Sequence, residues 1–415
     1  MSARRRVVVT GMGGICAIGA TWQSVRDGLR SGRSGIMTMP EWASIEGLRT
    51  RLGAPVTDPV DLERFGRKKL RGMGRVARLA ALAADAALAD AKLRGEPFIS
   101  DGTLGLAFGS TSGSPPALVA YGQAFGIDRS TRGVGPLDYL KLMSHTVAAN
   151  LAQLFEIRGR VIPTCSACTS GSQAIGAGME AILLGRQPAM LVGGAEELHE
   201  VESSVFDMLL ATSTRNDAPE QSPRPFDIDR DGLVVGEGAG ALVLEDLDFA
   251  RRRGATIQAE VLGYATSCDG LHLTSPDAGG MQRVMALALS DADLSPRDID
   301  YVNAHATATQ MGDVAESAAL HAIFGPRVPV SSLKGHMGHT LGACGALEAW
   351  CTIAMMNEGW VAPTLNLARV DPQCAPLDYV VAAPRDIPIR HAMSNNFAFG
   401  GVNTSLVFRR WDEAA

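Results

Sequence analysis

Three residues of this chain, Cys168, His305 and His339, could together perform acyl transfer. A cysteine sulfur forms thioesters when a neighbouring group activates it, and an imidazole can act as base or as hydrogen-bond donor in such a reaction. The three residues are distant along the chain, so this chemistry requires the fold to bring them together. We predict that they line one common cavity.

Cys168 lies in a turn of small residues between an expected strand and an expected helix. Val161 and Ile162 indicate the end of the strand, and apolar residues at helical spacing follow over 175–182. The start of a helix offers unpaired N–H groups and the positive end of the helix dipole, which favour a thiolate. We therefore expect a reactive sulfur at Cys168, with a buried structural cysteine as the alternative.

Both histidines follow short expected strands. Residues 301–303 lead to His305, and residues 328–330 lead into 331–339, which ends at His339. A helix rich in small residues is then expected over 342–356. This order of strand, turn and small-residue helix repeats the order around the cysteine. We predict two α/β halves of similar plan, 1–254 and 255–415, whose equivalent loops meet at their junction.

Other uses of these residues remain open. A zinc site on Cys165, Cys168, His336 and His339 has suitable Cys-x-x-Cys spacing, although structural zinc sites normally lie on short knuckles. A thiol–disulfide switch between Cys165 and Cys168 is another interpretation. A subunit that only shapes a partner's cavity is the non-enzymatic alternative.

Composition narrows the class of protein. The chain has 415 residues, of which 46% are hydrophobic, and this predicts a large core. The net charge of −6 argues against nucleic acid as a partner. The apolar run Val7–Val9 is too short for a signal peptide, and no stretch is long enough to span a membrane. Seven scattered cysteines without a secretion signal are typical of a cytoplasmic protein with free thiols.

Two local patterns in the first half need an interpretation. Gly11, Gly13 and Gly14 follow a short apolar strand, but the third glycine of a dinucleotide-binding fingerprint is missing, so we expect a tight turn. Basic residues cluster over 64–78 in an otherwise acidic protein. Such a cluster is either a solvated face or a patch that attracts an acidic partner.

Several motifs taken together resemble those of the β-ketoacyl-acyl-carrier-protein synthases, of the type II elongating kind. The resemblance runs from Val7 to Phe408, with the motifs in family order and spacing: 164–171 around the cysteine, 226–238, 303–316, 334–345 and 399–403. It implies a thiolase-type α/β fold with duplicated halves in a five-layered αβαβα arrangement. Proteins of this family are normally dimeric.

The resemblance also implies roles for single residues. Cys168 would hold an acyl chain as a thioester, taken from the phosphopantetheine arm of acyl carrier protein. His305 and His339 would assist decarboxylation of malonyl carrier protein and stabilise the enolate. The N–H groups of Cys168 and Phe399 would hold the oxyanion, and Phe399 would gate access. Lys334 would pair with Glu316 and so tie the two histidine loops together.

Binding residues and partners follow from the same resemblance. Contacts to the pantetheine arm are expected from Thr307, Thr309, Phe399 and Gly400, and docking of the acidic carrier protein from Arg64, Arg67, Lys68, Lys69 and Arg71. The chain would form a homodimer, or a heterodimer with a chain-length factor, and would need no cofactor and no metal.

Ala306 and Met337 depart from the family pattern, which has glycine and threonine there, so the substrate is open. Segments 39–42, 331–350 and 394–397 are similar to ketosynthases of aryl-polyene and related type II polyketide pathways. Such a specialised ketosynthase, paired with a chain-length factor, is the alternative to an enzyme of fatty acid elongation.

Overall fold

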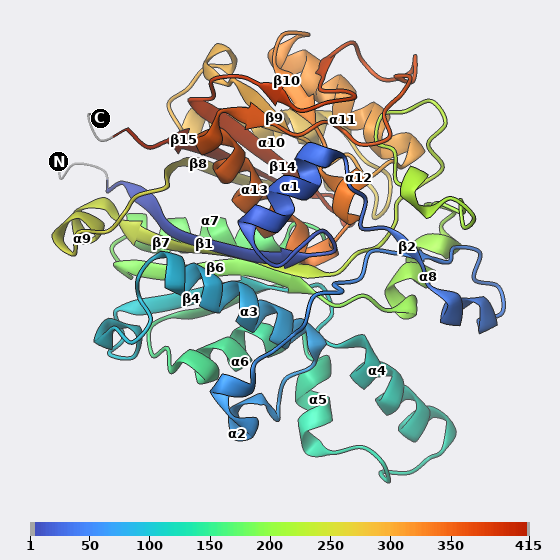
Figure 1. The fold of residues 1–415 in the computed structure, drawn as a ribbon, viewed down its shortest axis with the longest axis vertical. Helices are drawn as coiled ribbons and strands as arrows, with labels where there is room; N and C mark the ends of the chain where they lie inside the picture. Colours follow the sequence, from blue (N-terminus) through green and yellow to red (C-terminus); the bar gives the residue numbers. More distant parts are fainter. Residues whose placement is uncertain (1–4, 413–415) are drawn as a thin grey trace.

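A single hydrogen-bonded sheet of eleven strands runs through the computed structural model, which describes residues 5–412 (Figure 1). From one edge to the junction, the first half contributes β5 (Val161–Thr164), β4 (Leu104–Gly109), β6 (Ala189–Glu196), β7 (Gly238–Asp246) and β1 (Val7–Cys16). From the junction outward, the second half contributes β8 (Ala259–Cys268), β15 (Val402–Arg410), β14 (His391–Phe397), β9 (Tyr301–Asn303), β10 (Pro329–Ser331) and β12 (Asp378–Tyr379).

The two halves repeat one topology. Counted along the chain, the five main strands of each half follow the order first, fifth, fourth, second, third from the β1–β8 junction outward. The directions also agree, because β4 pairs in parallel with β5 and β6 as β9 does with β10 and β14. The predicted duplication of the fold is therefore confirmed.

Helices complete five layers. In the central layer, α7 (Ser170–Leu183) and α13 (Cys344–Glu358) contact each other and strands of both halves. The outer layers are α3 (Arg75–Asp90) with α6 (Thr146–Phe155) on the first half, and α10 (Ala278–Asp291) with α11 (Gln310–Phe324) on the second (Figure 1). This is the αβαβα arrangement that the family resemblance implies.

The central helices are close-packed because their sequences are small and apolar. Every residue of α13 from Cys344 to Met356 is buried, as expected for a helix that is apolar on all sides. Gly171 of α7 has no room for a side chain, since a Cβ there would lie 2.9 Å from the carbonyl oxygen of Gly342. Small residues thus let α7 approach the segment that leads into α13.

The tight turn predicted at Gly11–Gly14 is wrong. Strand β1 continues through these residues to Cys16 and pairs with β7 along its length. A Cβ at Gly11 would lie 2.3 Å from the carbonyl oxygen of Ala87, and one at Gly13 would lie 2.6 Å from the Cβ of Ala86. The glycines allow α3 to approach the strand.

Other helices lie at the periphery: α1 (Trp22–Ser31), α2 (Arg67–Leu70), α4 (Pro115–Tyr121), α5 (Pro136–Leu142), α8 (Glu200–Met208) and α9 (Leu247–Arg252). The short helix α12 (Lys334–Met337) is buried along its whole length. Two small ladders, β2 (Met37–Thr38) with β3 (Leu52–Gly53) and β11 (Trp360–Val361) with β13 (Arg385–Asp386), complete the structure. Over residues 5–412, none of the helices combines the length and the apolar character needed to cross a bilayer.

Candidate active site

A sharp backbone turn presents Cys168 between β5 and α7. Ala167 adopts a left-handed conformation with φ of 50°, which is uncommon for a residue with a side chain. The N–H of Ser166 donates to the hydroxyl of Ser170 at 2.9 Å and closes the turn. The turn leaves Cys168 6% exposed, facing a cavity. The predicted change from strand to helix at this cysteine is confirmed.

The first half of the chain holds the backbone of His339. The N–H of His339 donates to the carbonyl of Val234 at 2.7 Å, and the N–H of Gly236 donates to the carbonyl of His339 at 2.9 Å. Gly338, just before the histidine, has a left-handed φ of 71°, where glycine avoids the strain of a side chain. The glycine-rich loop of the first half therefore positions a histidine of the second.

Cys168, His305 and His339 meet in one cavity of about 320 Å³. The sulfur of Cys168 lies 3.0 Å from Nε2 of His339, and the two imidazole rings are 5.1 Å apart and nearly perpendicular. The predicted common cavity is confirmed. Its wall includes Phe206, Leu233, Thr307, Thr309, Met311 and Phe399.

Burial keeps the reacting groups uncharged. It raises the pKa of the Cys168 thiol to about 12, although the charge of Lys334 and the N–H groups of Cys168 and Phe399 act in the opposite direction. Burial, reinforced by Lys334, holds the pKa values of His305 and His339 well below their ordinary value. Burial therefore opposes the thiolate that the start of the helix favours, and the imidazole that contacts the sulfur also has a lowered pKa.

Lys334 pairs with Glu348 rather than with Glu316, so the predicted partner is wrong. Its Nζ lies 2.5 Å from Oε1 of Glu348 on α13, and both side chains are fully buried. A buried cation requires such a partner because desolvation is costly. The other carboxylate oxygen of Glu348 accepts a hydrogen bond at 2.7 Å from Asn396 of β14.

Glu316 supports the His305 loop in a different way. Its two oxygens accept the N–H groups of His305 at 2.8 Å and Ala306 at 2.6 Å. Burial raises the pKa of Glu316 to about 8, although the two N–H donors act to lower it. Glu316 therefore positions the backbone that carries the imidazole, and it also borders the cavity.

Sequence reasoning missed Glu348 and Asn396. The amide of Asn396 contacts Glu348 and also lies 3.5 Å from Nδ1 of His305, so it joins the ion pair to the site. A signal for Glu348 was present, since it is the only acidic residue of the apolar stretch 344–356. A lone acid in a buried helix requires a cationic or hydrogen-bonding partner.

Some of the residues predicted to bind the pantetheine arm border the cavity and others do not. Thr307 and Thr309 border the cavity, with their hydroxyl oxygens 3.1 Å apart. Gly400 is not part of the cavity wall, and its N–H donates to the carbonyl of Leu273 at 2.7 Å, so the structure does not support the contact with the pantetheine arm predicted for this residue. Of the two family departures, Ala306 borders the cavity, whereas Met337 packs into the main core.

The zinc interpretation is wrong for the residue set that the spacing suggested. Both ring nitrogens of His336 contact backbone carbonyl oxygens, of Arg33 at 3.0 Å and Pro363 at 3.2 Å. In the part of the chain that the structure describes, potential metal-ligating atoms converge instead in two other groups, Cys168 with His305 and His339, and His305 with Cys344 and Glu348, each within 4.8 Å of one another. Cys165 is exposed, and its thiol contacts the carbonyl of Thr111.

The basic cluster is partly neutralised. Arg64 pairs with Asp85 of α3, and Lys69 pairs with Glu156 at 2.9 Å. Arg67, Lys68 and Arg71 are exposed, and within residues 5–412 they make no ion pair. Of the five predicted docking residues, three remain free to attract an acidic surface.

Comparison with known proteins agrees with this geometry. The family models for the N-terminal and C-terminal domains of β-ketoacyl synthase match residues 4–250 and 258–368. 3-Oxoacyl-[acyl-carrier-protein] synthase 1 of Escherichia coli is 38% identical over 98% of this chain and 99% of its own length.

Solved structures lead to the same family. A β-ketoacyl synthase from Burkholderia phymatum is 53% identical, with a TM-score of 0.97 over 98% of this chain and all of its own. A type II polyketide ketosynthase, solved in complex with its acyl-carrier protein, is 30% identical with a TM-score of 0.88, over 99% of this chain and all of its own. The cysteine, the two histidines and the duplicated sheet that joins them are thus those of the family to which this chain belongs, the β-ketoacyl synthases.

Proposed function

We propose that this protein catalyses decarboxylative Claisen condensation between an acyl group held on Cys168 and a malonyl group delivered by an acyl carrier protein. The observation that carries this proposal is the 3.0 Å contact between the Cys168 sulfur and Nε2 of His339, in a cavity shared with His305. The names of the relatives and the carrier-protein complex of a similar ketosynthase support it.

The first step transfers the acyl group to the enzyme. The Cys168 sulfur attacks the carbonyl carbon of the carrier thioester while its proton passes to Nε2 of the neutral His339. The N–H groups of Cys168 and Phe399 both point at the sulfur, so they are placed to stabilise the oxyanion. The carrier thiolate leaves and takes the proton from His339, which restores the neutral imidazole.

The second step forms the carbon–carbon bond. Loss of carbon dioxide from the malonyl group leaves an enolate, whose oxygen accepts hydrogen bonds from N–H groups of His305 and His339. The carbanion attacks the acyl carbonyl on Cys168, and the sulfur leaves as the new bond forms. The Cys168 sulfur regains a proton from solvent, and the β-ketoacyl chain departs on the carrier protein. Imidazoles held neutral by burial can donate to the enolate while they remain uncharged.

Carrier-protein docking belongs to the same proposal. Arg67, Lys68 and Arg71 offer exposed positive charge on and beside α2, whereas Arg64 and Lys69 already have acidic partners. We expect carrier binding to weaken with salt, because exposed charges are screened over about 10 Å at 0.1 M ionic strength. Reversing Lys68 and Arg71 to glutamate tests this face, and unchanged affinity would exclude it.

A dimer is proposed through the outer edge of the first half. Strand β5 ends the sheet, and Val161 on it is 41% exposed. Nearby, the α4–α5 segment exposes Leu118, Phe125 and Ile127, the last by 72%. Exposed apolar surface of this kind is typical of an interface. Because Cys168 is intact, we propose that this chain is the active subunit, either of a homodimer or of a pair with a chain-length factor. A role in an aryl-polyene pathway stays a prediction.

The test compares two buried thiols. We expect Cys168→Ala to lower formation of β-ketoacyl carrier protein by at least about a thousandfold, because the covalent step is lost. Cys344→Ala, a second buried cysteine whose sulfur contacts the carbonyl of Cys168, is the matched control and should stay near the wild-type rate. Mass spectrometry of the carrier protein measures both, and condensation by Cys168→Ala would exclude the mechanism.

A further inference from the structure

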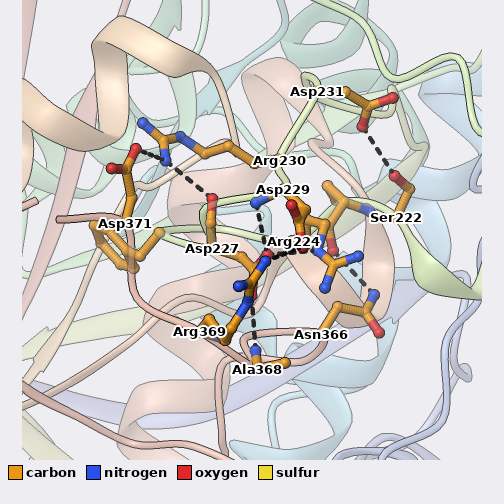
Figure 2. A network of polar contacts seen from close by, with 12 residues as sticks. Ser222, Arg224, Asp227, Asp229, Arg230, Asp231, Asn366, Ala368, Arg369 and Asp371 are labelled. Carbon is orange, nitrogen blue, oxygen red and sulfur yellow. Dashed lines mark hydrogen bonds and ion pairs between the residues drawn. The ribbon is translucent and has the colours of Figure 1, made fainter. Parts of the chain in front are cut away.

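Two segments that are distant in sequence form part of the cavity wall. Residues 231–233 come from the loop before β7, and residues 309–312 come from the start of α11. Arg230 lies directly before the first segment, in a network of charged side chains (Figure 2). Its guanidinium is fully buried, although the residue serves no step of the proposed reaction.

Arg230 joins its own loop, which continues into residues 231–233, to the start of α11. Its Nη2 donates to the carbonyl of Gln310 at 2.9 Å and its Nε to the carbonyl of Thr309 at 3.3 Å. Its Nη1 donates to Asp371 at 2.6 Å and to the carbonyl of Asp227 at 3.0 Å (Figure 2). The side chain of Gln310 returns a bond, donating to the carbonyl of Arg230 at 2.6 Å.

Asp313 of α11 bonds residues that precede each of the two segments. One of its oxygens accepts the N–H of Phe226 at 2.7 Å and the other accepts the N–H of Ala308 at 3.1 Å. Both residues are left-handed, with φ of 64° and 68°, a costly conformation that surrounding bonds must maintain. Arg230 lies 3.7 Å from Asp313, so one buried ion cluster maintains both turns.

We propose that Arg230 is a positioning residue that sets the wall along which the substrate's arm reaches Cys168. The inference rests on the proposed function. Through Thr309 and Gln310 it fixes the threonines of the cavity wall relative to the loop at 231–233. The expected consequence is selective: weakening this link should penalise a thioester on a full pantetheine arm more than one on a truncated arm.

A lysine cannot replace this residue. Arginine presents five N–H donors in a planar fork, and Arg230 uses them on three carbonyls and a carboxylate. A lysine at this position keeps the positive charge beside Asp371 and Asp313 but has too short a reach and too few fixed donors for both segments. Arg230→Lys therefore separates charge from geometry.

The experiment measures acylation of Cys168 from two substrates with the same acyl group, a pantetheine thioester and an N-acetylcysteamine thioester. We expect the rate advantage of the full arm to fall by about tenfold in Arg230→Lys, since small displacements at a positioning group have effects of this size. Gln310→Met removes the returned bond and leaves the Gln310 carbonyl bonded to Arg230, so it should lower the advantage by a smaller factor, and it avoids any loss of folding in the arginine variant.

The control is Arg369→Gln. Arg369 belongs to the same network but pairs with Asp229 at 3.1 Å on the surface, where it is 69% exposed (Figure 2). Arg369→Gln should leave the rate advantage of the full pantetheine arm unchanged. Equal losses for both thioesters in the Arg230 and Gln310 variants, or no loss in either, would overturn the inference. Failure of the wild type to acylate Cys168 from either thioester would instead overturn the proposed function.

Discussion

The two halves of the molecule use the same backbone plan for different chemistry. In the first half, the turn between β5 and α7 presents Cys168. In the second half, the equivalent segment between β10 and α13 carries His339 and Lys334, and Lys334 forms a buried ion pair with Glu348 of α13. The duplicated fold therefore supplies a nucleophile from one turn and hydrogen-bonding and charged groups from the other.

This difference shows why the site needs both halves. Burial raises the pKa of the Cys168 thiol to about 12, although the positive charge of Lys334, in the other half, opposes this rise. The same charge helps keep His305 and His339 neutral. The backbone of His339 is held in turn by the glycine-rich loop of the first half. Each half thus tunes or positions the other's reacting group.

The strongest test of this division concerns decarboxylation. We expect His339→Ala and His305→Ala each to lower the release of carbon dioxide from malonyl carrier protein by about a hundredfold or more, because donors to the enolate are lost. Cys168→Ala should still release carbon dioxide, since the sulfur takes no part in that step. Release of labelled carbon dioxide measures all three variants. Loss of decarboxylation in the cysteine variant alone would reverse the proposed roles of the halves.

The next test concerns the buried ion pair. We expect Glu348→Gln to lower the free energy of unfolding by about 3–5 kcal/mol, because it leaves the Lys334 charge buried without its partner. The double variant Lys334→Met with Glu348→Leu should recover most of that loss but remain impaired in condensation. Urea unfolding gives both values.

A matched surface pair in the first half provides the control for this test. Lys69 and Glu156 are 39% and 60% exposed, so Glu156→Gln should cost less than about 1 kcal/mol. Equal losses of unfolding free energy in Glu348→Gln and Glu156→Gln would show that the buried ion pair of the second half matters no more for stability than an exposed one.

The smallest expected effect is on the reactivity of Cys168 with pH. Because burial raises the thiol pKa to about 12, the thiol dominates at pH 7, and the thiolate fraction should rise about tenfold per pH unit from 7 to 9. Iodoacetamide labelling of Cys168, followed by peptide mass spectrometry, should show no plateau in this range. Lys334→Met should label more slowly. A plateau near pH 7 would indicate a resting thiolate.

Local sequence predicted much of this arrangement. Small residues around Cys168 and over 342–356 predicted turns followed by closely packed helices, and both are present. Prediction failed where a residue's environment comes from elsewhere in the chain. Gly11 and Gly13 have the local pattern of a turn but lie in a strand because α3 packs against them. The family resemblance assigned Glu316 to Lys334, whereas the folded chain places Glu348 of α13 beside the lysine.

By itself, the sequence determined the reacting residues, the repeated plan of the two halves and the family, because these depend on residue types and on spacing along the chain. Only the tertiary structure decided that Glu348 neutralises Lys334, that Arg230 bonds residues at the start of α11, and that burial opposes a thiolate at Cys168. Charge and protonation depend on which groups are brought within a few ångströms and on how much water is excluded, and neither distance nor burial is a property of local sequence.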